Sequence, residues 1–188
     1  MPAGDLKQLP VTAARIDKTR ALDRLRTLTR DKLTALTDSQ KMAHAGAIHE
    51  ETRQEDPKDT RAIEAQYLAR GLAERVEVLE DTLTALQALR PRAFTEESPI
   101  ALTAIVAIET LQEDPADRAL KTSAESVPTF YFLVPVAGGE RIELDDATIH
   151  CITPGSPLGQ EIVGRYLDDE VELELPGGLR KALIVDLA

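Results

Sequence analysis

The amino-acid sequence predicts an α+β protein, in which a long antiparallel helical hairpin is followed by a small antiparallel β-sheet with one short helix. Residues 12–89 are rich in Ala, Leu, Glu, Arg and Lys and hold a single proline, Pro57. Residues 100–188 instead hold short apolar or alternating runs separated by Gly and Pro. We therefore expect a hairpin over residues 1–90, a linker over 91–99 and a β-rich domain over 100–188.

Two stripes of apolar residues predict the hairpin. The first stripe has helical spacing, and the second steps by four and three residues as in a heptad seam. Their members are Leu22, Leu25, Thr29, Leu33 and Leu36, then Leu72, Val76, Leu79, Leu83 and Leu86. Two such segments with one break between them indicate an antiparallel coiled coil.

The seam changes to small residues toward the break. Ala43, Ala45, Gly46 and Ala47 precede the break, and Ala62, Ala65 and Ala69 follow it. Small residues let two helices approach closely, which predicts a hairpin that narrows into a probe. Alanine is also the best helix former, so a purely structural interpretation stays open.

The break between the helices is acidic, with five acidic residues among the ten from Glu50 to Asp59. Pro57 suits the first turn of a second helix, which makes Asp56 its N-cap and gives Asp59 the position of a capping-box acid. Capping alone accounts for both carboxylates locally. It does not account for the additional acids at a narrow tip.

The β-rich domain is predicted from short runs and turn residues. Polar residues 114–127 form a connection with some helix, and Gly138-Gly139 and Gly177-Gly178 are expected in hairpin turns. A short helix begins at Pro157, with Ser156 as its N-cap, and continues through Tyr166. Strands are expected over residues 100–108, 129–134, 147–152, 170–175 and 180–187.

Composition excludes several classes of protein. One Cys rules out a disulfide framework and a cysteine zinc cluster, and no apolar run is long enough to span a membrane. We expect a cytoplasmic protein that binds no membrane. A net charge of −11 opposes binding to duplex DNA, so any DNA binding is expected to be weak.

The charge is distributed unevenly. Residues 1–54 hold 10 Lys or Arg and 7 Asp or Glu, whereas residues 55–188 hold 12 and 26. Arg20, Arg24 and Arg30 are candidates for electrostatic contact with RNA or with a protein partner. A solvated helix face is the simpler explanation of the same residues.

Motifs of enzymes are scarce. His49 is followed by Glu50 and Glu51 without the second His that a zinc-binding helix requires, and no nucleophile triad is visible. His150 and Cys151 are neighbours in a predicted strand, so at least one of them should point into the core.

Four features of the second domain follow one another at defined spacing: the Ser156-Pro157-Leu158-Gly159 turn, the short helix, the acidic turn at Asp169-Glu170 and the Pro176-Gly177-Gly178 turn. In this order and spacing the sequence resembles the bacterial Gre transcript cleavage factors (GreA/GreB). The tip from Glu55 to Thr60 is similar to that family's acidic tip, and the helix after it carries Tyr67, Arg70, Gly71 and Glu80 as the family does. The resemblance covers roughly residues 40–188.

The resemblance implies a function and a fold for the second domain, which is FKBP-like in this family. Gre factors bind bacterial RNA polymerase through that domain, at a turn that corresponds to Gly155, Ser156, Pro157 and Leu158 here. They insert the coiled coil into the secondary channel, where the tip acids, here Asp56 and Asp59, help to hold a catalytic Mg²⁺. The polymerase then cuts backtracked RNA, so the factor contacts nascent RNA only indirectly, is not itself an enzyme and is expected to be a monomer.

The tip departs from the family pattern. Glu55 stands where the family has Gly, Pro57 stiffens the tip, and Asp59 is one methylene shorter than the family's Glu. Some Gre-like proteins bind the same channel and inhibit transcription without stimulating cleavage, and this second function stays open. A prolyl isomerase is a third hypothesis, which the scarcity of aromatic residues does not favour.

Overall fold

The computed structural model describes residues 12–51, 60–113, 120–122, 127–175 and 178–188. The chain divides into two compact units. One unit is helical and consists of residues 23–89; the other contains the β-strands and consists of residues 90–188 together with the first residues of the chain, up to Leu22.

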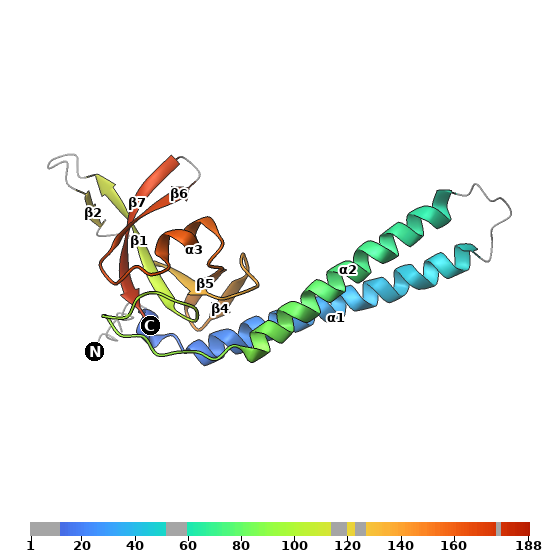
Figure 1. Ribbon diagram of the computed structural model, residues 1–188, viewed down its shortest axis with the longest axis horizontal. Helices are drawn as coiled ribbons and strands as arrows, with labels where there is room; N and C mark the ends of the chain where they lie inside the picture. Colours follow the sequence, from blue (N-terminus) through green and yellow to red (C-terminus); the bar gives the residue numbers. More distant parts are fainter. Residues whose placement is uncertain (1–11, 52–59, 114–119, 123–126, 176–177) are drawn as a thin grey trace, which may run out of the picture. The chain divides into compact units, whose positions relative to one another are not determined.

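Two long helices, α1 (Lys18–Glu51) and α2 (Thr60–Ala88), run side by side in opposite directions through the helical unit (Figure 1). Helix α1 begins at Lys18 and not near Thr12, because the Asp17 carboxylate accepts hydrogen bonds from the backbone N–H groups of Thr19 and Arg20 at 2.8 and 3.2 Å. Asp17 thus caps a helix end that would otherwise leave these donors without partners.

The predicted seam is the face that the two helices bury. Leu25 and Leu86 are fully buried and Val76 is 8% exposed, whereas Val78, which lies off the seam, is 64% exposed. The remaining residues of the two predicted stripes are half-buried or buried: Leu22, Thr29, Leu33, Leu36, Leu72, Leu79 and Leu83. The described residues of the two predicted stripes are therefore less exposed than Val78, which lies off them.

The small-residue seam is only partly described. Ala69 is half-buried, as predicted, but Ala45 is exposed and does not belong to the buried face. The side chains of Ala43, Gly46, Ala47, Ala62 and Ala65 lie outside the described part of the structure.

Arg26 ties the two helices together. The Arg26 guanidinium donates hydrogen bonds to the carbonyl oxygens of Leu86, at 2.8 and 3.0 Å, and of Leu89, at 3.1 Å. It also pairs with Asp23 at 2.8 Å. Because the last carbonyls of a helix have no partners within the helix, Arg26 caps the end of α2.

The second unit is built on one mixed sheet. Six strands lie in the order β4-β5-β3-β1-β7-β6, and β2 pairs with the end of β1. The strands are β1 (Ile105–Glu113), β2 (Leu120–Thr122), β3 (Thr129–Leu133), β4 (Arg141–Leu144), β5 (Ala147–Ile152), β6 (Glu170–Leu175) and β7 (Gly178–Leu187), and the short helix is α3 (Pro157–Ile162).

The prediction of a purely antiparallel sheet is wrong. Strands β3 and β5 pair in parallel, with Phe130 opposite Ile149 and Phe132 opposite Cys151. The parallel pairing arises because β4 is inserted between them in the chain and forms a hairpin with β5 at the outer edge. Gly138-Gly139 lies in the connection between β3 and β4, which do not pair with each other, so the predicted hairpin turn at these glycines is wrong. The hairpin turn is Asp145-Asp146, between β4 and β5.

The first predicted strand is displaced along the chain. A strand over residues 100–108 was expected, but β1 covers Ile105–Glu113. Thr103 has a φ of 76°, which interrupts extended backbone, and its hydroxyl accepts a hydrogen bond from the Arg92 N–H at 2.9 Å. Within the 114–127 connection the structure describes Val127 and the strand β2, and the sequence did not predict this strand.

Helix α3 begins as predicted and ends earlier. It stops at Ile162 instead of continuing through Tyr166, because Val163 has extended backbone and Gly164 has a φ of 81°. The alternating strand before the last turn is confirmed as β6, and its antiparallel register with β7 places Leu175 opposite Gly178.

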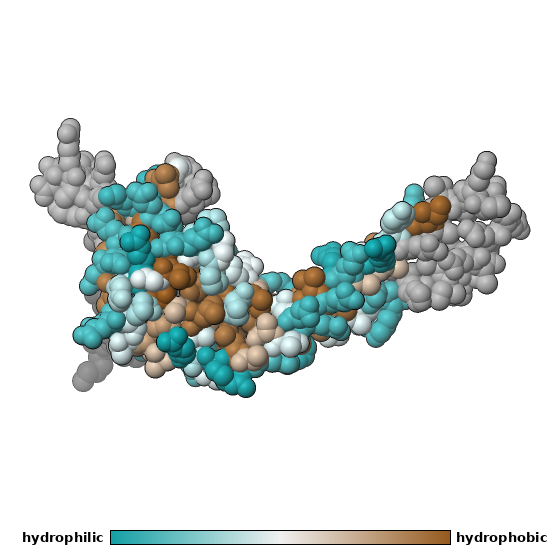
Figure 2. Space-filling model, in the orientation of Figure 1, coloured by the Kyte–Doolittle hydropathy of each residue, from teal (hydrophilic) through white to brown (hydrophobic). Residues whose placement is uncertain are grey.

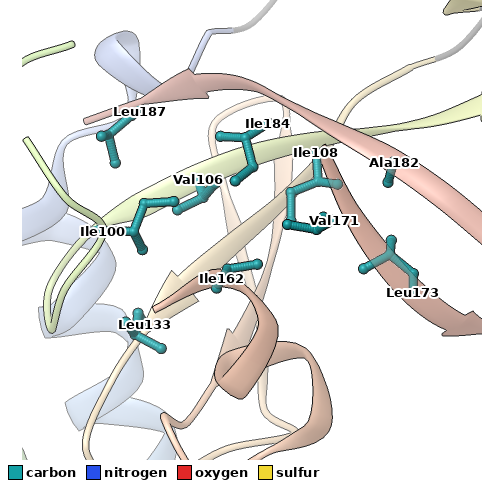
Figure 3. Packing of buried hydrophobic residues seen from close by; sticks show 11 residues of the cluster. Ile100, Val106, Ile108, Leu133, Ile162, Val171, Leu173, Ala182, Ile184 and Leu187 are labelled. Carbon is teal, nitrogen blue, oxygen red and sulfur yellow. The ribbon is translucent and has the colours of Figure 1, made fainter. Parts of the chain in front are cut away.

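The core lies between the sheet and α3 (Figure 3). It brings together residues from β1, β3, β6 and β7, from α3 and from the segment before β1: Ile100, Ala104, Val106, Ile108, Leu133, Ile162, Val171, Leu173, Ala182, Ile184 and Leu187. Residues that alternate with these, such as Ile105 and Phe132, are also fully buried, so the other side of the sheet is covered as well.

The segment before α1 folds against the sheet. A short 3₁₀ turn, η1 (Ala13–Arg15), contacts β1 and β7. The Ala13 N–H donates to the Asp186 carboxylate at 2.7 Å, and Ala13 is fully buried. Across the described residues no helix has the length and apolar character needed to cross a membrane.

Candidate functional site

The two tip acids, Asp56 and Asp59, lie outside the described residues. The structure describes α1 up to Glu51 and α2 from Thr60, so both acids belong to the segment that connects the two helices. In the described part of the chain, no three His, Cys, Asp or Glu side chains are grouped as a metal site would require.

The turn over Gly155–Leu158 is tightly held by hydrogen bonds. The Ser156 side-chain oxygen accepts from the Gly159 N–H at 3.1 Å and donates to the Thr153 carbonyl at 2.7 Å. The Gln160 side-chain amide donates to the Gly155 carbonyl at 3.2 Å. The predicted N-cap is therefore present, and the turn has a fixed shape at the start of α3.

Gly159 allows this turn to close. A Cβ atom at this position would lie 1.9 Å from the Thr153 carbonyl oxygen and 2.9 Å from its carbon. No real Cβ atom approaches backbone so closely, so the fourth residue of the Ser-Pro-Leu-Gly motif is required by packing. Gly155, by contrast, is exposed, and a Cβ atom added there would meet no other atom within 4 Å.

Pro157 and Leu158 line both of two neighbouring hollows in the surface, and the boundary that they form between these hollows is called the ridge below. The smaller hollow, of about 280 Å³, is also lined by Tyr131, Leu173 and Leu179. The larger, of about 610 Å³, extends from the same ridge and Tyr131 to Gly138-Gly139 and His150. Figure 2 shows hydrophobic residues gathered over the middle and lower part of this unit, among polar ones. A ridge between two partly apolar hollows is suited to contact with a protein surface.

The sequence analysis missed Tyr131, which lines both hollows. It lies in β3 next to Phe130 and Phe132, and the alternation of that strand puts it on the opposite face from these two buried rings. The two-residue repeat of a β-strand, which places Tyr131 on the other face from Phe130 and Phe132, was the signal that could have identified it. Burial raises the pKa of the Tyr131 hydroxyl above its usual value.

His150 and Cys151 have the different environments expected of neighbours in a strand. His150 is half-buried, and its ring centroid lies 5.8 Å from that of Tyr131. Cys151 is buried, and desolvation together with the charge of Glu140 raises the pKa of its thiol to about 12. Such a thiol is almost entirely protonated at neutral pH and is a poor nucleophile.

The three candidate arginines are not alike. Arg20 forms a bidentate ion pair with Asp145, with both N–O distances at 3.0 Å, so its guanidinium is already paired within its own unit. Arg24 and Arg30, in α1, are exposed. Lys18, at the start of the same helix, lies 4.8 Å from the centre of the Phe94 ring and donates to the Arg92 carbonyl, and burial lowers its pKa.

The lining of the hollows does not resemble an aromatic isomerase pocket. Among their described lining residues Tyr131 is aromatic and Phe is absent. Phe130 and Phe132 are 5% and 0% exposed and belong to the core, and Tyr166 lines neither hollow.

Comparison with known proteins gives no family. The chain matches no known protein-family profile and no curated protein. Among solved structures it is similar to the transcription factor Gfh1, at 22% identity over 86% of this chain and 92% of that chain, with a TM-score of 0.34. The GreA factor homolog 1 (Gfh1) protein of Thermus thermophilus shows 21% identity over 97% and 99% of the two chains, with a TM-score of 0.33.

A third solved structure is the transcription elongation factor GreA/GreB from Nitrosomonas europaea. It is 19% identical over 62% of this chain and 91% of that chain, with a TM-score of 0.31. TM-scores at this level do not define a shared fold.

Proposed function

We propose that the protein binds bacterial RNA polymerase, enters its secondary channel and stimulates cleavage of backtracked RNA by the polymerase, so that elongation resumes. The FKBP-like β-rich unit supplies the main contact with the polymerase, and the coiled-coil hairpin formed by α1 and α2 carries the acidic tip. The protein acts as a cytoplasmic monomer, contacts nascent RNA only through the polymerase complex and has no catalytic activity alone.

The observation that carries the proposal is the turn at Gly155–Leu158. Its sequence, with the elements that follow it, resembles the polymerase-contacting turn of Gre factors. Its structure supports contact with a protein, because Pro157 and Leu158 stand as a ridge between two hollows and the Ser156 cap keeps that ridge in place. A preformed ridge loses little conformational freedom when it binds.

The acids of the tip supply the chemical part of the proposal. Asp56 and Asp59 offer the hard carboxylate oxygens that Mg²⁺ prefers, and Mg²⁺ needs only one or two carboxylates from a given protein. Bound jointly with polymerase residues, a second Mg²⁺ supplies activation of the attacking water in a two-metal displacement. The tip therefore completes a site that the polymerase mostly provides.

An inhibitory channel-binding factor is the alternative function. The residues that favour it are Glu55, Pro57 and Asp59, where the tip departs from the Gre pattern. A stiffer tip with a shorter second acid would occupy the channel yet place its carboxylate differently. Both functions require the same contact with polymerase and differ in their effect on RNA cleavage.

Binding of the full chain to core RNA polymerase tests the contact. We expect Leu158→Ala to weaken binding about tenfold or more, because a half-buried ridge residue at the centre of an interface contributes strongly to affinity. Val163→Ala is the matched control, since Val163 is 43% exposed, follows α3 and lines neither hollow. Absence of binding by the unchanged protein would contradict the proposal.

A further inference from the structure

The rims of the two hollows carry charge of one sign. Glu161 and Glu172 line the smaller hollow and Glu140 lines the larger, and no Lys or Arg is among their described lining residues. Leu158, which is half-buried, and Leu179, which is 70% exposed, contribute apolar surface beside these carboxylates. The site is thus an apolar ridge and two hollows with an acidic rim.

Two basic side chains of a neighbouring hollow contact groups of this chain. A third hollow beside the smaller one is lined by Arg165 and Lys181 together with Glu161, Glu170 and Glu172. Lys181 pairs with Glu170 at 3.6 Å, and the Arg165 guanidinium donates to the Glu161 backbone carbonyl at 3.3 Å. Within the described residues, the exposed carboxylates of Glu161 and Glu172 form no ion pair.

This chemistry selects one kind of occupant. Apolar side chains gain free energy when they fill the hollows, whereas phosphate groups are repelled by the carboxylates at the rim. Lysine or arginine beside those apolar side chains would satisfy the carboxylates. The combination fits a polypeptide and opposes RNA or DNA.

We infer that the site accepts a segment of the polymerase protein in which apolar side chains stand next to Lys or Arg, and that Glu161 and Glu172 select this segment. The inference rests on the proposed function and adds the chemistry of the partner surface. Charges at the rim of an interface act mainly on the rate of association and on its dependence on salt.

Binding of the full chain to purified core RNA polymerase, measured at low and at high salt, tests this inference. The test variant is Glu161→Gln with Glu172→Gln, which keeps side-chain shape and removes two negative charges. We expect it to weaken binding about three- to tenfold at low salt, since exposed ion pairs contribute modestly. The difference should shrink at high salt, because screening weakens the pairs in the unchanged protein.

The matched control is Glu96→Gln with Glu97→Gln, which removes two exposed charges from a turn that lines none of the three hollows. We expect this control to bind as the unchanged protein does. Equal weakening in both double variants would overturn the inference, because net charge and not the rim would then be responsible.

Two further outcomes separate this inference from the proposed function. If the unchanged protein binds polymerase and the Glu161 and Glu172 variant binds equally well at every salt concentration, the inference is wrong and the proposed function stands. If the unchanged protein does not bind polymerase, both are wrong. Melting of each variant checks that the substitutions leave the β-rich unit folded.

Discussion

Gly159 determines the shape of the candidate docking turn. Sequence reasoning identified Ser156 as the N-cap and Pro157 as the first helical residue, because caps follow local rules. It did not identify the close approach between Gly159 and the Thr153 carbonyl, which depends on how β5 leads into the turn. The hydrogen bonds of the Ser156 cap could thus be predicted from the sequence, but the steric need for glycine at position 159 could not.

Gly159→Ala should destabilise the β-rich unit by about 1–3 kcal/mol, because the new Cβ would force the backbone of Thr153 or α3 to move. Urea unfolding followed by circular dichroism measures the change.

Gly155→Ala is the control for this substitution. Its Cβ would meet nothing within 4 Å, so stability should change by less than about 1 kcal/mol. Equal effects of the two substitutions would mean that the turn is not closely packed at Gly159.

Cys151 should be unreactive in the folded protein. Its pKa is raised to about 12 from an ordinary value of 9.0, so a thiol reagent at pH 8 should label it slowly until denaturant is added. Because the folded-state pKa is the higher one, the stabilisation is complete below the unfolded-state pKa and is lost as pH rises from about 9 to 12.

Cys151→Ala separates this contribution from other groups that titrate at high pH, including Tyr131. The variant should lose stability less steeply between pH 9 and 12 than the unchanged protein. Rapid labelling of the folded protein at pH 8 would contradict the burial of this thiol.

At the scale of elements, the helical hairpin was easier to predict than the sheet. The seam of α2 could be read from spacing alone, because a heptad repeat places residues on one face whatever surrounds the helix. The parallel pairing of β3 and β5 could not be predicted from the sequence, because strands with the same alternation can pair in either direction. The four-residue strand β4 is too short for a distinct periodic signal.

Contacts between distant parts of the sequence were also outside what the pattern could predict. The Ala13 N–H and the Asp186 carboxylate are 173 residues apart, and nothing in either segment indicates the other. The sequence around Arg26 likewise indicates only a basic helix face, whereas the structure shows its contacts with the end of α2. The periodicity of a sequence indicates which residues are buried, but not which residues they contact.

In the seam of the hairpin, replacing a buried side chain by alanine should cost more stability the more deeply that side chain is buried. Leu86→Ala should cost about 2–5 kcal/mol because Leu86 is fully buried, and Leu79→Ala should cost less because Leu79 is half-buried. Unfolding in urea, followed by the helical circular dichroism signal, provides both values.

Val78 is the control on the same helix. Since it is 64% exposed, Val78→Ala should change stability by no more than about 0.5 kcal/mol. A cost for Val78→Ala similar to that for Leu86→Ala would show that the buried face of α2 has been assigned wrongly.

At the scale of the whole molecule, function is expected to be divided between the two units. The β-rich unit carries a ridge and hollows suited to a protein surface, and the helical unit carries the segment with Asp56 and Asp59. The sequence motif had singled out Gly155–Leu158, the turn that includes this ridge. The acidic rim at Glu161 and Glu172 became evident only when β6 and α3 were seen to line one hollow.

The central claim is tested most directly by RNA cleavage in backtracked polymerase complexes, with the unchanged protein, Asp56→Asn and Asp59→Asn compared at several Mg²⁺ concentrations. Asparagine can still cap a helix but lacks the charge that attracts Mg²⁺. We expect the unchanged protein to stimulate cleavage. Both variants should keep their melting temperature and their affinity for polymerase, lose the stimulation and recover part of it at high Mg²⁺.

Two results of this measurement would contradict the account. If both variants stimulate cleavage as well as the unchanged protein, Asp56 and Asp59 serve only as helix caps. If the unchanged protein binds polymerase, slows elongation and never stimulates cleavage at any Mg²⁺ concentration, it is the inhibitory channel-binding factor.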